Sequence, residues 1–444
     1  MYSMRTRKSG RERWSICCGT FRCRDWFVMQ SFRRHLQICS LAVFLGWVQA
    51  SVAAQPVGLD RDEAGLWMLV DRHEQYLRTS NKFIADNRLN GALHSLTCKT
   101  VGRLCENLRV YAVRAPGFNA FMMPNGAMFV QSGLLLRISD DAELAAVLGH
   151  EASHFTRRHS VMSMRRWRRT ASGFAMVGAL VSAAGSVASA SATTYDGVAN
   201  AQNMSNTAML MLQTASVVAA FQLVAYDRAQ EKQADMEGFE WMQKNGLDVA
   251  GAHRIWKKLV DEQAAGGKES GFSLLATHPT PQERLSYLSD MVNESQMAAA
   301  DASVGIEGEV PNTIRPLIDA YRDDWIVDEM EVQSPQQFAA IVKAQTEFGI
   351  IPGYAAYLEA KSWASHAKSL KGRQQREALT QAADAFGRGA NSESGMPAEG
   401  YREWAKINVK KGDVESARRN FEKYLALNPD AWDAAYIRRT MESL

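Results

Sequence analysis

Cysteine, net charge and long apolar runs are all scarce in this sequence of 444 residues. The formal net charge is +3; residues 1–54 hold nine Lys or Arg against two Asp or Glu, so the remaining residues sum to −4. A mildly acidic chain of this kind offers no basic surface, and we therefore expect no nucleic-acid partner. The hydrophobic fraction of 46% and the charged fraction of 22% fit a globular protein with a sizeable core.

The longest apolar run near the N-terminus, Leu36–Val48, is short for a transmembrane helix. Two arginines precede it, and the small residues Ala50–Ala54 follow it. A basic region, an apolar region and a small-residue cleavage site are typical of a secretory signal peptide. We predict that residues 1–54 form such a peptide, with cleavage after Ala54 and Met29 as the true start. An uncleaved membrane anchor is the alternative.

Only two cysteines, Cys98 and Cys105, lie beyond residue 54. An even number in an exported chain favours a disulfide that closes a short loop, with a pair of buried thiols as the alternative. A metal site at these cysteines is disfavoured, because no nearby His or Cys completes a ligand set.

The most informative motif is His150-Glu151-Ala152-Ser153-His154, inside a predicted helix at 141–158. Residues four apart share one face of a helix, so His150 and His154 can bind the same Zn²⁺ ion. Glu151 then lies beside the metal-bound water, where it can act as the general base.

A catalytic zinc ion usually has three protein ligands, and the third must come from elsewhere in the chain. Glu231, in a second predicted helix, is the best candidate. Asp235 lies one turn later on the same face, where it can accept the second N–H of a ligand histidine.

We expect a helix at 60–95, then strands at Leu108–Ala115 and Ala127–Gln131 with a turn at Pro124–Gly126 between them. Residues 171–226 are rich in Ala, Ser, Gly and Met, with one charge at Asp196. We favour two tightly packed core helices for this segment, and peripheral contact with a membrane is the alternative.

The last third of the chain contains a weak repeat. After a helix predicted to end at Val292, residues 293–311 are a polar linker, and residues 312–444 are helical. Ala382-x₃-Phe386 recurs 35 residues later as Ala417-x₃-Phe421. This period matches the tetratricopeptide repeat of about 34 residues. The predicted role is a partner-binding surface or a cap that stabilises the preceding domain.

Four blocks together resemble the zinc metalloproteases of the CAAX-prenyl-endopeptidase and HtpX type, which are gluzincins. The blocks are Asn119-Ala120-Phe121 with Pro124-Asn125-Gly126, Glu143-Leu144-Ala145-x-Val147-Leu148-x-His150-Glu151-x-x-His154 with Arg158-His159, Arg228-x-x-Glu231-x-x-Ala234-Asp235, and Thr277-His278-Pro279-x₄-Arg284-Leu285. The signal peptide and the repeat-like tail resemble the periplasmic branch of that family. Two departures are Asn125, where the family has Gly, and Ser153, where Gly usually precedes the second His.

This resemblance implies an α+β, zincin-like metalloprotease domain at 55–292, mainly helical with a small sheet, followed by an all-α tetratricopeptide-like domain. One zinc ion per chain is expected on His150, His154 and Glu231, with Asp235 beside the ligands. The resemblance also implies that His278 lies near the metal, as an oxyanion stabiliser or a cap on the zinc. Arg284 either stabilises the oxyanion or pairs with a carboxylate as scaffold, and we favour scaffold.

The predicted function is an exported zinc metalloendopeptidase that hydrolyses misfolded or misassembled envelope proteins, with Glu151 as general base. We expect an extended substrate to add a strand along the edge near Ala127–Gln131. The resemblance implies a place in the periplasm of a Gram-negative bacterium, peripheral to the outer membrane, and contact of the tail with outer-membrane protein assembly machinery. The alternative is a chaperone-like, largely latent protein that binds partners through its tail.

Overall fold

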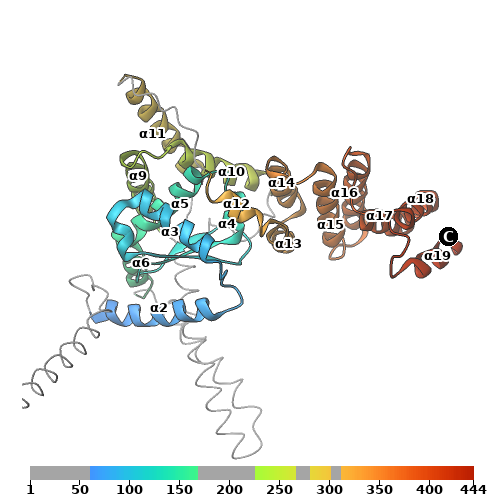
Figure 1. The fold of residues 1–444 in the computed structure, drawn as a ribbon, viewed down its shortest axis with the longest axis horizontal. Helices are drawn as coiled ribbons and strands as arrows, with labels where there is room; N and C mark the ends of the chain where they lie inside the picture. The colour runs from blue at the N-terminus through green and yellow to red at the C-terminus, as the bar shows by residue number, and fades with distance from the viewer. Residues whose placement is uncertain (1–60, 169–225, 267–280, 302–311) are drawn as a thin grey trace, which may run out of the picture. The chain divides into compact units, whose positions relative to one another are not determined.

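The computed structural model describes residues 61–168, 226–266, 281–301 and 312–444 (Figure 1). Residues Arg61–Leu444 belong to one compact unit. Within the described ranges, no helix has the length and apolar character needed to cross a membrane. The predictions of a signal peptide at 1–54, of the small-residue segment up to residue 225, and of a role for His278 lie outside the described residues.

The only sheet among the described residues has three strands, β1 (Arg109–Val113), β2 (Ala120–Met122) and β3 (Ala127–Gln131), in the order β1-β3-β2. β1 runs parallel to β3, and β2 runs antiparallel to it. A tight turn joins β2 to β3. Gly126 has a φ of 82° in this turn, and a Cβ atom there would lie 2.3 Å from the carbonyl oxygen of Asn107. Glycine is therefore required at the turn.

One prediction about the sheet was incomplete and one was wrong. The turn at Pro124–Gly126 lies between β1 and β3 in the sequence, as expected, but it directly follows β2, whose three residues are too few to show an alternating pattern. Ala127–Gln131 is the central strand and is paired on both sides. A substrate strand cannot add to β3 itself. Of the two edge strands, β1 already pairs with residues 82–84, which leaves β2 as the open edge in the described part of the chain.

The helices of this part of the chain pack against the sheet or against one another (Figure 1). They are α2 (Arg61–Thr79), α3 (Asn87–Val101), η1 (Gly102–Asn107), α4 (Ser132–Arg137), α5 (Asp141–Thr156), α6 (His159–Arg168), α9 (Arg228–Lys244), α10 (Ala250–Gly266) and α11 (Pro281–Asp301). The single helix predicted at 60–95 is two helices, because the Asp86 side chain accepts hydrogen bonds from the N–H groups of Arg88 and Leu89 and starts α3 anew. α11 continues to Asp301, so the predicted linker at 293–311 is helical in its first part; no Gly or Pro interrupts that stretch.

The motif helix α5 is the buried centre of the domain. It begins at a cap in which the Asp140 side chain accepts from the N–H of Glu143, and its residues 141–154 are all buried. α5 and α9 cross where Gly149 faces Gly238. A Cβ atom on Gly238 would lie 2.9 Å from the backbone nitrogen of His150, so the two backbones touch at this point. This contact holds the helix that carries Glu231 against the helix that carries both motif histidines.

The C-terminal part is entirely helical outside its turns, as expected. It contains α12 (Arg315–Asp319), α13 (Arg322–Val332), α14 (Pro335–Gln345), η4 (Thr346–Phe348), α15 (Pro352–His366), α16 (Gly372–Asn391), α17 (Ala398–Lys411), α18 (Val414–Leu427) and α19 (Ala434–Glu442). α12–α14 share one hydrophobic core with the sheet and α5, whereas a second core covers Ala360–Ile437. The prediction of a mainly helical α+β domain with a small sheet is confirmed; the tetratricopeptide character of the tail stays a prediction.

A buried ionic network fastens α12–α14 to the domain. Arg137 on α4 donates to Glu262 on α10 at 2.5 and 2.8 Å and to Glu329 on α13 at 2.9 Å. The same Glu329 accepts from the N–H of Gly117, and Glu262 accepts from Gln337 on α14. Every charge in the network thus has a hydrogen-bonded partner, which a buried charge requires.

Candidate metal centre

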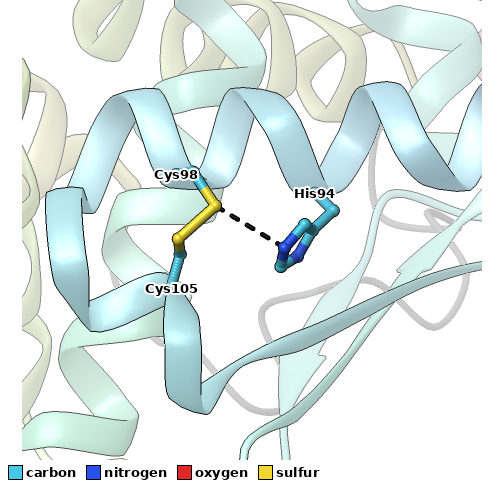
Figure 2. A group of neighbouring side chains, drawn as sticks. All are labelled: His94, Cys98 and Cys105. Carbon is cyan, nitrogen blue, oxygen red and sulfur yellow. Dashed lines mark hydrogen bonds between the residues drawn. A yellow bond between two sulfur atoms is a disulfide. The ribbon is translucent and has the colours of Figure 1, made fainter.

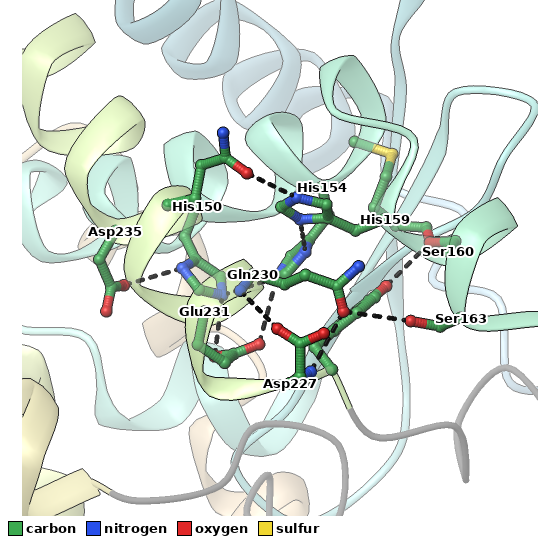
Figure 3. Close-up of polar contacts among 12 residues, drawn as sticks. His150, His154, His159, Ser160, Ser163, Asp227, Gln230, Glu231 and Asp235 are labelled. Carbon is green, nitrogen blue, oxygen red and sulfur yellow. Dashed lines mark hydrogen bonds and ion pairs between the residues drawn. The ribbon is translucent and has the colours of Figure 1, made fainter. Parts of the chain in front are cut away.

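Three side chains converge between α5 and α9 (Figure 3). The Nε2 atoms of His150 and His154 lie 3.0 Å apart, and the Glu231 carboxylate lies 3.7 Å from the first and 3.5 Å from the second. All three residues are at most 3% exposed. The i, i+4 spacing on α5 and the crossing with α9 therefore bring together the three ligands that the sequence indicates.

The donor set fits a zinc ion. Tetrahedral zinc with ligand bonds of about 2.0–2.1 Å places its ligand atoms about 3.3 Å from one another. The observed separations of 3.0, 3.5 and 3.7 Å bracket this value. Two imidazoles and one carboxylate are also the protein ligands of a known class of catalytic zinc sites.

Asp235 accepts a hydrogen bond from Nδ1 of His150 at 2.8 Å, which is the position that the spacing suggested. The Nδ1–H of His150 is thereby engaged, so Nε2 of the same ring is left to face His154 and Glu231. Burial alone would raise the pKa of Asp235, but Arg284 and His150 reverse this effect and hold the pKa well below its usual range. The carboxylate is therefore ionised and can fix the His150 ring.

Arg284, on α11, lies behind the ligands and is 2% exposed. Its guanidinium binds both oxygens of Asp235 at 2.6 and 2.8 Å and one oxygen of Glu231 at 2.7 Å. It also stacks on the Trp256 ring, 3.5 Å from the ring centre. Three of its N–H groups donate to carboxylates, and Nη2 also lies 3.2 Å from Nδ1 of His150, so the geometry supports a scaffold role for Arg284.

Glu151 is buried at 1% exposure between the two motif histidines on α5. Tyr226 lies near it: burial and the Glu151 carboxylate raise the pKa of the Tyr226 phenol, which stays protonated. Burial lowers the pKa of His150, and Arg284 lowers it further. The imidazole is therefore neutral at physiological pH, as a metal ligand must be.

His159 was not recognised as a site residue from the sequence, although it lies in the motif block. It follows the end of α5 and returns to contact His154 (Figure 3). The two departures from the family pattern are accommodated: Ser153 donates to Glu237 at 2.6 Å, and Asn125 donates to Asp71 at 2.7 Å and Glu74 at 2.8 Å.

A second cluster, His94, Cys98 and Cys105, lies at the end of α3 (Figure 2). A disulfide joins the two cysteines. The sequence argument against a metal here was that no nearby His or Cys completes a ligand set; Nε2 of His94, one turn before Cys98, does lie 3.6 Å from the Cys98 sulfur. Both sulfur atoms are used by the disulfide, so we do not treat this cluster as a metal centre.

Residues 85–292 match peptidase family M48. A putative beta-barrel assembly-enhancing protease of Vibrio cholerae is 29% identical over 218 residues, 48% of this chain and 41% of the relative. The beta-barrel assembly-enhancing protease of Escherichia coli is 24% identical over 285 residues, 62% of this chain and 55% of the relative. Metalloprotease LoiP of E. coli is 27% identical over 187 residues, 42% of this chain and 63% of the relative. The chain thus spans about half the length of the first two relatives.

Proposed function

We propose that the protein is a zinc metalloendopeptidase of the bacterial envelope, and the match of residues 85–292 to peptidase family M48 supports this proposal. Its substrates are misfolded or misassembled envelope proteins. The observation that carries the proposal is the convergence of His150, His154 and Glu231, buried beside Glu151. A protein that had become a pure binding module would not need this complete set of ligands and base.

The chemistry follows from the side chains around the site. His150, His154 and Glu231 would hold a zinc ion, which would supply the Lewis acidity that lowers the pKa of a water molecule to about 7 and polarises the scissile carbonyl. Glu151 takes the proton of the attacking water and delivers it to the leaving amine. Asp235 orients His150, and Arg284 holds Asp235 and Glu231 in place. His278 acts beside the metal, either stabilising the oxyanion or capping the zinc.

The substrate adds as a strand to β2, because the other edge strand, β1, already pairs with residues 82–84. This edge adjoins the centre, because the carbonyl oxygen of Met122 accepts a hydrogen bond from Ser160 at the start of α6. Main-chain pairing at β2 fixes the register of the peptide without selecting its sequence. Such pairing suits an enzyme that acts on exposed, extended segments of misfolded proteins.

The names of two relatives, which refer to β-barrel assembly, support a role in the maturation of outer-membrane proteins. We propose that a signal peptide at 1–54 directs the chain to the periplasm, peripheral to the outer membrane. The helical tail contacts the assembly machinery there. The alternative is a chaperone-like, largely latent protein that uses the same tail.

The test is casein hydrolysis by the purified chain, the same chain with a chelator, and the Glu151→Gln variant. We expect the variant to keep its zinc and to lose hydrolysis, because an amide cannot accept the proton. Hydrolysis at the wild-type rate in Glu151→Gln would exclude Glu151 as the base. Zinc bound without any hydrolysis in the wild type would favour the latent, chaperone-like alternative.

A further inference from the structure

His154 has a neighbour of an unusual kind for a ligand histidine. Its Nδ1 atom lies 2.9 Å from Nδ1 of His159, and both residues are fully buried. On the other side of the ring, Nε2 of His154 faces His150 and Glu231. His150, in contrast, has a carboxylate at the corresponding position, that of Asp235. The two ligand histidines are therefore supported by groups of different charge.

The hydrogen bonds assign the proton positions. If Nε2 of His154 is the ligand atom, its proton is on Nδ1, and Nδ1 of His159 must accept it. The proton of His159 is then on Nε2, which lies 3.1 Å from the Oε1 acceptor of Gln233. The donors run in one direction, from His154 to His159 to Gln233. Each of the two hydrogen bonds in this relay therefore has one donor and one acceptor.

The backbone explains why His159 can reach back. α5 ends at Thr156, and Arg158 has a φ of 55°, the only positive value for a residue other than glycine in the described ranges. This left-handed residue turns the chain so that α6 starts at His159. Such a conformation is unfavourable for any residue with a Cβ, so a local gain must offset it.

Two further contacts hold the arrangement. Gln233 is two residues after Glu231 on α9, so the chain of hydrogen bonds ends on the helix that carries the third ligand. Tyr226 stacks on the His154 ring at 3.8 Å with an interplanar angle of 13°. Its hydroxyl lies 2.8 Å from Oγ of Ser160, the residue after His159.

We infer that His159 is a positioning residue that fixes the Nδ1–H tautomer and the ring orientation of His154 through a neutral relay to Gln233. The inference rests on the proposed metal centre and deepens it. Partners of this kind typically change metal affinity 10–100-fold when removed. Because His159 does not face the other ligand atoms, its loss should weaken zinc binding without removing a ligand.

Two amide variants of the full chain test this role. In His159→Asn the amide oxygen occupies the place of Nδ1 and can still accept from His154. In His159→Gln the amide occupies the place of Nε2, so the bond to Gln233 remains and the acceptor for His154 is lost. The zinc dissociation constant is measured by competition with a chromophoric chelator, and folding is checked by circular dichroism.

We expect zinc affinity to fall about 10–100-fold in His159→Gln and to stay within a few-fold of wild type in His159→Asn. Arg158→Gly should leave affinity unchanged, because glycine adopts the left-handed conformation without strain. Equal affinity in wild type and folded His159→Gln overturns this inference alone. A fall of the same size in both amide variants also overturns it, because the acceptor would not matter. A wild-type chain that binds no zinc overturns the proposed function as well.

Discussion

Replacing Arg284 by Met tests the electrostatic design of the centre. The guanidinium is buried and donates to Asp235 and Glu231 through three hydrogen bonds of 2.6–2.8 Å. Methionine keeps much of the packing against Trp256 but removes the charge. In the variant, the buried carboxylates of Asp235 and Glu231 lose the cation that they share, and their negative charges then repel each other.

The magnitude follows from the burial of this group. Removing one partner of a buried, hydrogen-bonded ion pair costs about 3–5 kcal/mol. Unfolding of the compact unit Arg61–Leu444, about 380 residues, carries an entropy of roughly 0.8 kcal/mol/K. A loss of about 4 kcal/mol therefore lowers the melting temperature by about 5 °C. Zinc bound at Glu231 supplies positive charge close to both carboxylates. The difference in melting temperature between wild type and Arg284→Met should therefore narrow when zinc is added.

The assay is thermal unfolding of wild type, Arg284→Met and Arg284→Lys, each with a chelator and with excess zinc. The lysine variant keeps the charge and loses the planar fork, so its melting temperature should lie between the other two. Equal melting temperatures for chelated wild type and Arg284→Met would refute the reasoning. A difference that is the same with and without zinc would refute its electrostatic part.

Two other substitutions probe separate features. Gly238→Ala places a Cβ atom 2.9 Å from the His150 backbone nitrogen, so it should push α9 from α5, cost about 1–3 kcal/mol and weaken zinc binding in chelator competition. Gly91→Ala is the matched control, because a Cβ atom at this position of α3 would have no heavy atom within 4 Å, and the substitution should be neutral or stabilising. Equal losses of stability in the two variants would contradict the close crossing of α5 and α9. Burial lowers the pKa of His73 on α2 to about 4, below the 6.5 expected when unfolded. As the pH drops, the unfolded chain therefore takes up a proton at His73 before the folded chain does, and wild-type stability falls between pH 6.5 and pH 4. In urea titrations at pH 7 and pH 5, His73→Phe should lose less stability than wild type. Equal losses in the two proteins would contradict this assignment.

The part of the site that was predictable from sequence lies on continuous helices. The i, i+4 relations of His150 with His154 and of Glu231 with Asp235 are local, so they follow from helix geometry alone. The three-stranded sheet was read incompletely, because β2 has only three residues and carries too little pattern. The break between α2 and α3 was missed because it depends on one cap at Asp86.

Other features depend on contacts between distant segments. His159 reaches His154 only because Arg158 adopts a left-handed conformation, which nothing in an arginine side chain signals. The pairing of Arg284 with Asp235 was one of the expected contacts, but its simultaneous contact with Glu231 requires the docking of α11. α12–α14 share one hydrophobic core with the sheet. The ion pair of Arg137 with Glu329, which accompanies this packing, joins residues separated by 192 positions.

The most direct test of the central claim is the metal content of the purified chain beside that of Glu231→Ala. The account predicts one zinc per wild-type chain and a strongly weakened zinc in the variant, because an oxygen ligand from α9 is lost. Undiminished zinc affinity in Glu231→Ala would move the third ligand elsewhere, and a wild-type chain without zinc would contradict the metal centre itself.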